Sequence, residues 1–213
     1  MASVINRNDR RREQTRQKLV AAATCLFISK GYNETTIDEV CAEADVAKVT
    51  FYYHFQSKDD IVREIKAAAT QEVFCGPARM LDDGESAVNV LRSLTMGIGS
   101  WTESNWRLLE VFLSQKFQHV AAAGTCADNE PNSLVNFLVR IIEHGKRNGE
   151  FRASADTAEM ASFIALAIFN QQVLWMHNQR QTSLIADFER CLDFVLNGVR
   201  SSATPGVQPI LKG

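Results

Sequence analysis

Apolar side chains recur three and four residues apart along most of this chain, and no stretch alternates apolar and polar residues between tight turns. Gly31 is expected to end the first helix, and Gly76 with Pro77 the fourth. The periodicity therefore predicts an all-α protein. The expected helices lie near residues 10–30, 37–44, 47–55, 57–75, 85–103, 105–120, 133–147, 156–178 and 182–200.

The second and third expected helices are short and are separated by a tight break at Ala44 and Asp45. Thr36, with Glu39 three residues later, fits the capping box that begins a helix. Two such helices packed on a longer first helix are the sequence form of a helix-turn-helix. The expected divisions are a helix-turn-helix domain with a basic N-terminal arm over 1–58, a larger helical bundle over 59–200 and a loose tail over 201–213.

Composition excludes several classes of protein. Hydrophobic residues make up 46% and charged residues 23%, which is ordinary globular usage and not that of a wholly disordered chain. The longest apolar stretch, at 161–169, is too short to cross a bilayer, and the charged N-terminus lacks the apolar block of a signal peptide. We therefore expect a cytoplasmic protein that has no membrane partner.

Five cysteines occur without a CxxC pair and without histidine at metal-ligand spacing, so reduced thiols and no metal site are expected. Cys126, beside an expected loop, is the one candidate redox sensor. Four histidines fall on separate helices, and the chain has no HExxH and no nucleophile elbow. We therefore expect no catalytic residues, no cofactor and no enzymatic activity.

Residues 49–55 read VTFYYHF and contain the chemistry of most interest. Phe51 and Phe55 share one helical face, four residues apart, and are expected in the core. The opposite face and its flanks could meet base edges and phosphates in a major groove. They could instead fill a joint between helices, as tyrosines often do. The side chains in question are Val49, Thr50, Tyr52, Tyr53 and His54.

Basic residues gather near the N-terminus, although the net charge of the whole chain is −2. A charge run of this kind is either a solvated end or an arm that seeks phosphates, and composition alone leaves both open. The cluster consists of Arg7, Arg10, Arg11, Arg12, Arg16 and Lys18.

The order of these features resembles the N-terminal domain of the tetracycline-repressor (TetR) family of bacterial transcription regulators, over about residues 10–62. The resemblance lies in the runs Lys30-Gly31-Tyr32, Thr35-Thr36-Ile37, Tyr52-Tyr53-His54-Phe55 and Ser57-Lys58. It implies an all-helical dimer whose third helix reads DNA and whose larger domain dimerises and binds an effector. The DNA-contacting residues expected are Thr36, Lys48, Val49, Thr50, Tyr52, Tyr53, His54 and Lys58, with Arg10, Arg11 and Arg12 of the arm.

Three positions depart from the family pattern. Asp45, Ala47 and Val49 stand where family members commonly have glycine, serine and glycine. Asp tolerates the left-handed conformation of a turn glycine, whereas an alanine cannot cap the reading helix, a loss of roughly 1 kcal/mol. The departures leave open whether DNA binding is weakened or retuned.

The last two expected helices are the dimerisation candidates, because Ala158, Ala161 and Ala165 would let another helix approach closely and the final helix has a continuous apolar face. Both features could equally serve ordinary packing within one chain. A two-fold dimer predicts a palindromic operator, with reading helices about 34 to 36 Å apart or a multiple of that spacing. We expect an apolar or aromatic effector, with Phe163, Asn170 and His177 on an inward line. Apolar stripes of this kind more often form core than a ligand pocket, and a neighbouring helix or water could equally be the partner of Asn170 and His177. The full set of effector candidates is Trp101, Trp106, Phe112, Phe137, Phe163, Asn170 and His177.

The resulting hypothesis is a ligand-responsive, sequence-specific transcriptional regulator, a repressor that a small molecule releases from its operator. Ligand binding is expected to shift the helix from Lys58 to Phe74 and so change the separation of the reading heads. The alternative is a helical binding module for a small molecule or a protein that has kept the fold and lost DNA readout.

Overall fold

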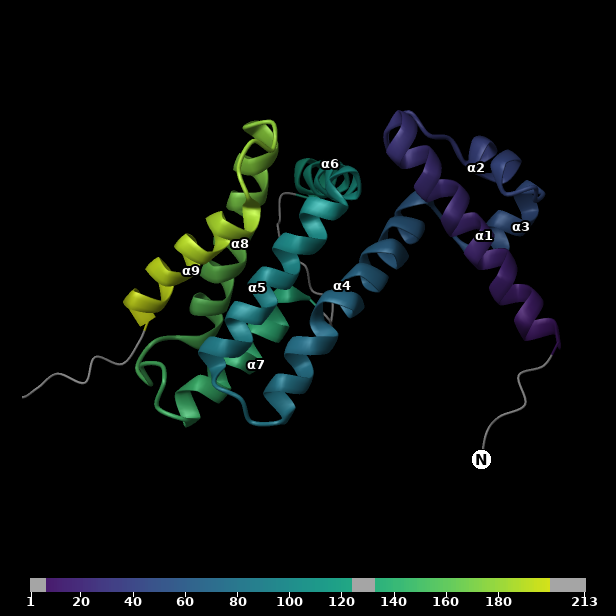
Figure 1. The fold of residues 1–213 in the computed structure, drawn as a ribbon. Helices are drawn as coiled ribbons and strands as arrows, with labels where there is room; N and C mark the ends of the chain where they lie inside the picture. Colours follow the sequence, from purple (N-terminus) through teal and green to yellow (C-terminus); the bar gives the residue numbers. More distant parts are fainter. Residues whose placement is uncertain (1–6, 124–132, 200–213) are drawn as a thin grey trace, which may run out of the picture. The chain divides into compact units, whose positions relative to one another are not determined.

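The structure is a computed structural model that describes residues 7–123 and 133–199 (Figure 1). The described residues are all-helical, as periodicity predicts, and each helix begins within a few residues of its expected place, although the fourth extends past its expected end at residue 75. The helices are α1 (Arg7–Lys30), α2 (Ile37–Glu43), α3 (Lys48–His54), α4 (Lys58–Asp82), α5 (Ala87–Ser104), α6 (Trp106–Ala123), α7 (Leu134–Arg147), α8 (Thr157–His177) and α9 (Leu184–Val199).

The chain forms two compact units. Among the described helices, the first unit holds α1, α2, α3, α4 as far as Glu72, and α6. The second unit holds the rest of α4 together with α5, α7, α8 and α9. The functional division expected at residue 58 stays a prediction, because compactness in space does not show which segment performs which task.

The core of the first unit lies where α1, α2, α3, the start of α4 and α6 converge. Leu19, Val40, Phe51 and Ile61 each have 0% of their surface exposed. Val111 of α6 joins this cluster, and Phe112 packs against it. The helix-turn-helix therefore shares its core with a helix that begins about fifty residues later in the chain, which local periodicity alone does not indicate.

The expectation that Gly76 and Pro77 end the fourth helix is wrong, because α4 continues to Asp82. A proline inside a helix typically costs about 3 kcal/mol. Here Pro77 and Leu81 are both buried, four residues apart on one face, and their packing favours continuation. The helix ends instead before Gly84, which has φ +79°.

The second unit closes two helix N-termini with glutamates from elsewhere in the same unit. Glu150 accepts hydrogen bonds from the backbone N–H groups of Ala87 and Val88, at 2.9 and 3.3 Å, at the start of α5. Glu103 accepts one from the N–H of Leu184 at 2.6 Å, at the start of α9. A carboxylate at this end of a helix satisfies free donors and complements the helix dipole.

The expected helix over 182–200 begins at Leu184, and its cap is Ser183 and not the neighbouring Thr182. Ser183 accepts the N–H of Ala186 at 3.4 Å, whereas the hydroxyl of Thr182 donates to Asp187 at 2.9 Å. Glu103 supplies the further acceptor, and its distance in sequence explains why local capping rules miss it.

Candidate nucleic-acid interface

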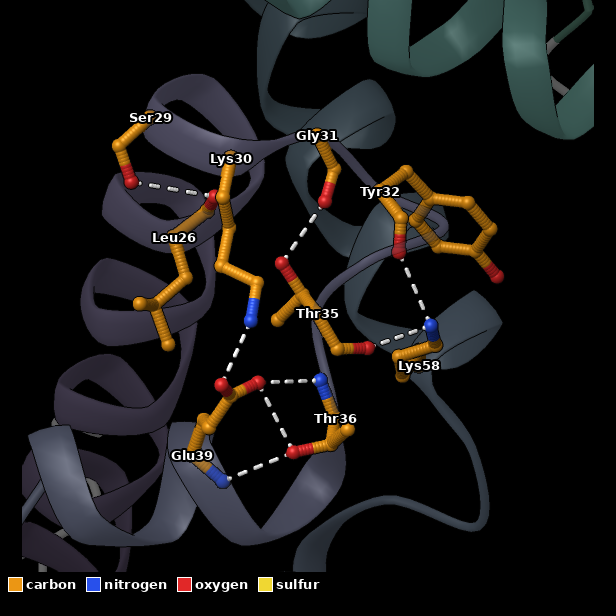
Figure 2. Close-up of polar contacts among 9 residues, drawn as sticks. All are labelled: Leu26, Ser29, Lys30, Gly31, Tyr32, Thr35, Thr36, Glu39 and Lys58. Atoms are coloured by element: carbon orange, nitrogen blue, oxygen red, sulfur yellow. Dashed lines mark hydrogen bonds and ion pairs between the residues drawn. The ribbon is translucent and has the colours of Figure 1, made fainter.

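The second helix carries a complete capping box, as expected from its sequence (Figure 2). The N–H of Thr36 donates to the Glu39 carboxylate at 2.8 Å, and the N–H of Glu39 donates to the Thr36 hydroxyl at 3.2 Å. Lys30 at the end of α1 reaches the same carboxylate at 2.6 Å. The Lys30 ammonium and the Thr36 donors lower the pKa of Glu39 to about 2. α2 therefore begins in a closed local network.

The turn after α2 confirms that Asp45 occupies the left-handed region, with φ 53°. The N–H of Val46 donates to the carbonyl of Cys41 at 3.0 Å, and that of Asp45 to the carbonyl of Ala42 at 3.3 Å. This pair of bonds is the Schellman ending, in which glycine is the usual left-handed residue. The Asp45 backbone thus makes the turn that the family commonly builds with glycine.

The third helix separates its aromatic side chains as its sequence predicts. Phe51 and Phe55 are 0% and 2% exposed, respectively, and face the core of the first unit. Val49 is 76% exposed, Tyr53 65% and Tyr52 51%. Since large apolar and aromatic side chains seldom remain this exposed together, the outer face of α3 is a candidate contact surface.

No side chain caps the N-terminus of α3, because Ala47 stands at the capping position. The backbone there has φ −71° and ψ 149°, the extended conformation in which a capping residue normally lies. Lys48 at the first helical position pairs with Asp38 of α2 at 2.7 Å, and this carboxylate raises the pKa of Lys48. The pair places a negative charge near an N-terminus that lacks a cap.

Arg16 of α1 holds the C-terminal end of α3. Its guanidinium donates to the carbonyl of His54 at 3.1 Å and lies over the ring of Phe55, 4.4 Å from the ring centre. The same guanidinium forms an ion pair with Glu64 of α4. A cation beside the last carbonyls of a helix also complements the negative end of its dipole. Arg16 therefore joins α1, α3 and α4, a role that sequence reasoning did not assign.

Arg12 is one of the arginines expected to contact DNA, and its guanidinium lies over the ring of Tyr53, 5.1 Å from the ring centre. Together with burial and Arg16, it lowers the pKa of His54, with burial the larger cause. Arg10 and Arg11 are exposed on the same helix. The predicted arm is helical from Arg7 onward, so these arginines extend from an ordered α1.

The ammonium group of Lys58 forms hydrogen bonds within the first unit (Figure 2). Its ammonium donates to the carbonyls of Tyr32 and Thr35 at 2.9 and 2.6 Å, and it lies over the Tyr32 ring. Burial lowers its pKa. Because an ammonium has three N–H donors, the predicted phosphate contact remains compatible with these bonds and stays a prediction. The observed bonds fasten the loop between α1 and α2 to the start of α4.

Hydrogen bonds through Asp59 also link α6 to the start of α4 and to the loop between α1 and α2. The hydroxyl of Tyr32 donates to Asp59, and the amide of Gln115 donates to that carboxylate at 3.0 Å. Burial, and then Asp59, raises the pKa of Tyr32. Sequence reasoning missed Gln115, since nothing local to α6 marks a partner 56 residues away.

The predicted effector residues do not form one described cluster. Trp106 and Phe112 belong to the first unit, where Phe112 packs against the core. Trp101 and Phe137 belong to the second, where Phe137 is 5% exposed and stacks on Phe74 at 4.8 Å. Their role in effector binding stays a prediction.

The expectation that Phe163, Asn170 and His177 of α8 face inward is wrong. Phe163 is 58% exposed, and Asn170 and His177 are also exposed in the isolated chain. The buried face of α8 is instead formed by Met160, Ala161, Ile164, Ile168 and Trp175. Because α8 is apolar around most of its circumference, periodicity does not distinguish its inner face from its outer face.

Two further expectations concern absent features. Within the described ranges, no helix is both long enough and apolar enough to cross a membrane. No cluster of three or more potential metal ligands occurs in the part of the chain that the structure describes. Cys126 lies outside the described residues.

Comparison with known proteins agrees with this geometry. Residues 19–65 match the family of bacterial regulatory proteins, tetR family. The chain is 24% identical over 199 residues to the HTH-type transcriptional repressor BepR of Brucella suis biovar 1 (strain 1330), covering 89% of this chain and 94% of that protein.

Solved structures resemble the fold over most of its length. One is Thermus thermophilus FadR, a TetR family transcriptional repressor in complex with lauroyl-CoA, with TM-score 0.66, 24% identity, and coverage of 90% of this chain and 99% of that one. Another is the regulator FadR of Bacillus subtilis in complex with stearoyl-CoA, with TM-score 0.62, 18% identity, and coverage of 86% and 99%. With the capping box, the tight turn and the exposed face of α3, the match places residues 19–65 in the family of bacterial regulatory proteins, tetR family, and the solved structures show that the likeness in fold extends over most of the chain.

Proposed function

We propose that this protein is a transcriptional repressor that binds a palindromic operator as a homodimer and releases it when a small apolar molecule binds. The main support for the proposal is that α3 has one buried and one exposed face. Phe51 is buried, while Val49, Tyr52 and Tyr53 are exposed. A short helix held by its inner face and bare on its outer face fits the reading helix of a helix-turn-helix.

Positive charge for the DNA backbone is available beside this face. Arg10, Arg11 and Arg12 lie on the first turns of α1, and Arg12 touches Tyr53 of α3. Phosphate contacts position a reading helix on the duplex and make its affinity depend on salt. The net charge of −2 indicates that attraction to DNA is local to this part of the chain.

Dimerisation is supported by apolar side chains left bare on α8 and α9. Phe194 is 78% exposed, Leu166 61%, Phe163 58% and Leu174 44%. Exposed apolar residues of this size commonly mark protein interfaces. The corrected orientation of α8 thus assigns Phe163 to a surface that a second copy would cover. Sedimentation of the wild type and of Phe194→Glu tests this, with the variant expected to be monomeric.

Two structural neighbours hold long-chain acyl-CoA, which supports an acyl chain as the first effector class to test. Such a ligand releases DNA only if it prefers the arrangement that does not bind the operator. α4 contributes residues to both compact units, so it is the segment through which a change in the second unit would reach the first. Like its relatives, which are transcriptional regulators, the protein would act in the cytoplasm and perform no catalysis.

Selection of bound sequences from a random double-stranded DNA pool tests the proposal. The expected result is an enriched inverted repeat, bound with an affinity that falls steeply as salt rises. Lauroyl-CoA and free laurate are then titrated into the complex, and release by either supports the effector class. Binding of a ligand without any change in DNA affinity would refute the coupling.

A second candidate is a binding module that has lost DNA readout, which the uncapped Ala47 and the exposed Asp45 favour. The same selection separates the two, because the module would enrich no sequence at any salt concentration. Replacing Asp45 with Gly and Ala47 with Ser then shows whether these departures weaken the reader or adapt it.

A further inference from the structure

The reading helix lacks the side chains that most often recognise bases through hydrogen bonds. Its sequence, KVTFYYH, contains no Arg, Asn or Gln. Those residues supply the bidentate contacts to guanine and adenine in the major groove. Lys48, its one lysine, is paired with Asp38 at 2.7 Å. Besides Lys48 and the imidazole of His54, α3 offers the bases only hydroxyl groups and apolar contact.

Val49 is the most exposed large hydrophobic residue of this helix, at 76%. It is the second residue of α3, and the N-terminal residues of a reading helix are those that contact base edges. A valine in a helix keeps nearly one rotamer, so little side-chain entropy is lost when it meets a partner. The apolar group that a base pair presents in the major groove is the thymine methyl.

The surroundings of Val49 strengthen this assignment. Thr50 beside it is half-buried, and Tyr52 and Tyr53 follow on the same exposed side. The ion pair of Lys48 with Asp38 neutralises the nearest charges, so the first turn of α3 presents an apolar contact. An exposed valine there contributes nothing to the core, in contrast to Phe51.

We propose that Val49 is a specificity-determining residue, which recognises one thymine methyl in each half of the operator. The inference rests on the proposed function and names the chemistry that its reading helix selects. Burial of one methyl-sized group gives about a fourfold preference for thymine per half-site, and about fifteenfold for the two together.

The test uses the full chain and the operator obtained by selection. Each thymine of the half-sites is replaced in turn by deoxyuridine, which removes only the methyl group, and then by 5-bromodeoxyuridine, which restores its bulk. For the wild type, one thymine per half-site is expected to lose about fourfold in affinity as uracil and to recover it as bromouracil.

Two variants and a control complete the test. Val49→Ala removes the two γ-methyl groups in a residue of higher helix propensity, and it is expected to bind the thymine and uracil operators equally. Met96→Ala, which also shortens an exposed apolar side chain but on α5, should keep the wild-type preference. Val49→Gly should behave as Val49→Ala, with weaker binding overall.

The outcomes are distinct. An enriched operator whose thymines all tolerate uracil overturns the role of Val49 and leaves the proposed function standing. The same follows if Val49→Ala retains the uracil sensitivity of the wild type. Failure to enrich any sequence overturns both proposals.

Discussion

Helices α2 and α3 have the same length, seven residues each, and are held in opposite ways. α2 is closed by its own sequence, since Thr36 and Glu39 cap each other and Asp45 turns the chain at its other end. α3 has no side-chain cap and is held from outside, by Asp38 of α2 at one end and Arg16 of α1 at the other.

The difference has a consequence for function. A helix closed by its own residues keeps its conformation when its neighbours shift, whereas a helix held by other elements follows them. Arg16 pairs with Glu64 of α4, so a displacement of α4 would be felt at the C-terminal end of α3. The helix proposed to face DNA is therefore the one whose position the rest of the first unit controls.

The largest expected effect comes from removing the side chain that anchors α3 in the core. Phe51 is fully buried, so Phe51→Ala is expected to lower the free energy of unfolding by about 3–5 kcal/mol. Tyr53→Ala, on the exposed face, should lower it by less than about 1 kcal/mol. Urea denaturation measures both, and equal losses would contradict the inner and outer faces described here.

Removing the external clamp should have the next largest effect. Arg16→Ala deletes a bond to the His54 carbonyl and an ion pair with Glu64, and a partly exposed site of this kind should contribute about 1–2 kcal/mol. Operator affinity is expected to fall by more than this loss of stability explains, because α3 loses its orientation.

Arg16→Lys provides the control, since it keeps the charge and loses the planar fork that reaches two partners. Amide hydrogen exchange should show faster opening of α3 in Arg16→Ala while α2 is unchanged. Equal acceleration in both helices would show that Arg16 stabilises the whole unit and does not specifically hold α3.

Removing the cap of α2 and adding one to α3 should change the free energy of unfolding in opposite directions. Thr36→Ala should lower the free energy of unfolding by about 1 kcal/mol, and Ala47→Ser should raise it by about 1 kcal/mol. The Ala47 backbone already has the extended conformation that a capping serine needs. The double variant should match the wild type in urea denaturation, whereas a destabilising Ala47→Ser would show that α3 cannot accept a cap.

Local features of this fold were predictable from sequence because their causes are local. The capping box of Thr36 and Glu39 spans three residues, and Phe51 and Phe55 share a face by helical spacing alone. The same rules located all nine described helices. They failed at Gly76 and Pro77, where buried packing of Pro77 outweighs its cost in a helix.

Other features depend on contacts between distant segments. Arg16 and His54 are 38 residues apart, and no periodicity relates them. On α8 the sequence is apolar on nearly every side, so the exposure of Phe163 depends on which neighbours pack against the helix. Most residues expected to contact DNA lie on or beside α3, where local spacing gathers them, and their contacts with DNA stay a prediction. The effector candidates also stay a prediction, and local spacing does not gather them because a pocket is assembled from distant segments.

The smallest expected effect is a difference between the two helices in their response to acid. Burial, Arg12 and Arg16 lower the pKa of His54, so neutral His54 is favoured in the folded chain and stability falls as pH drops through the ordinary value of about 6.5. Glu39 has its pKa lowered to about 2, so its contribution is full above its ordinary value of 4.5 and is lost as pH falls towards 2. α3 should therefore weaken first on acidification, and α2 only below about pH 4.5.

Matched variants separate the two windows in urea denaturation at a series of pH values. His54→Gln removes the first titration, so its stability relative to the wild type should rise between pH 7 and 5. Glu39→Gln keeps an oxygen that can accept the Thr36 N–H and removes the charge, so its deficit against the wild type should shrink between pH 4.5 and 2. If the Glu39→Gln deficit stayed constant over that interval, the cap of α2 would owe nothing to the carboxylate charge, and hydrogen-bond geometry alone would distinguish it from the bare end of α3.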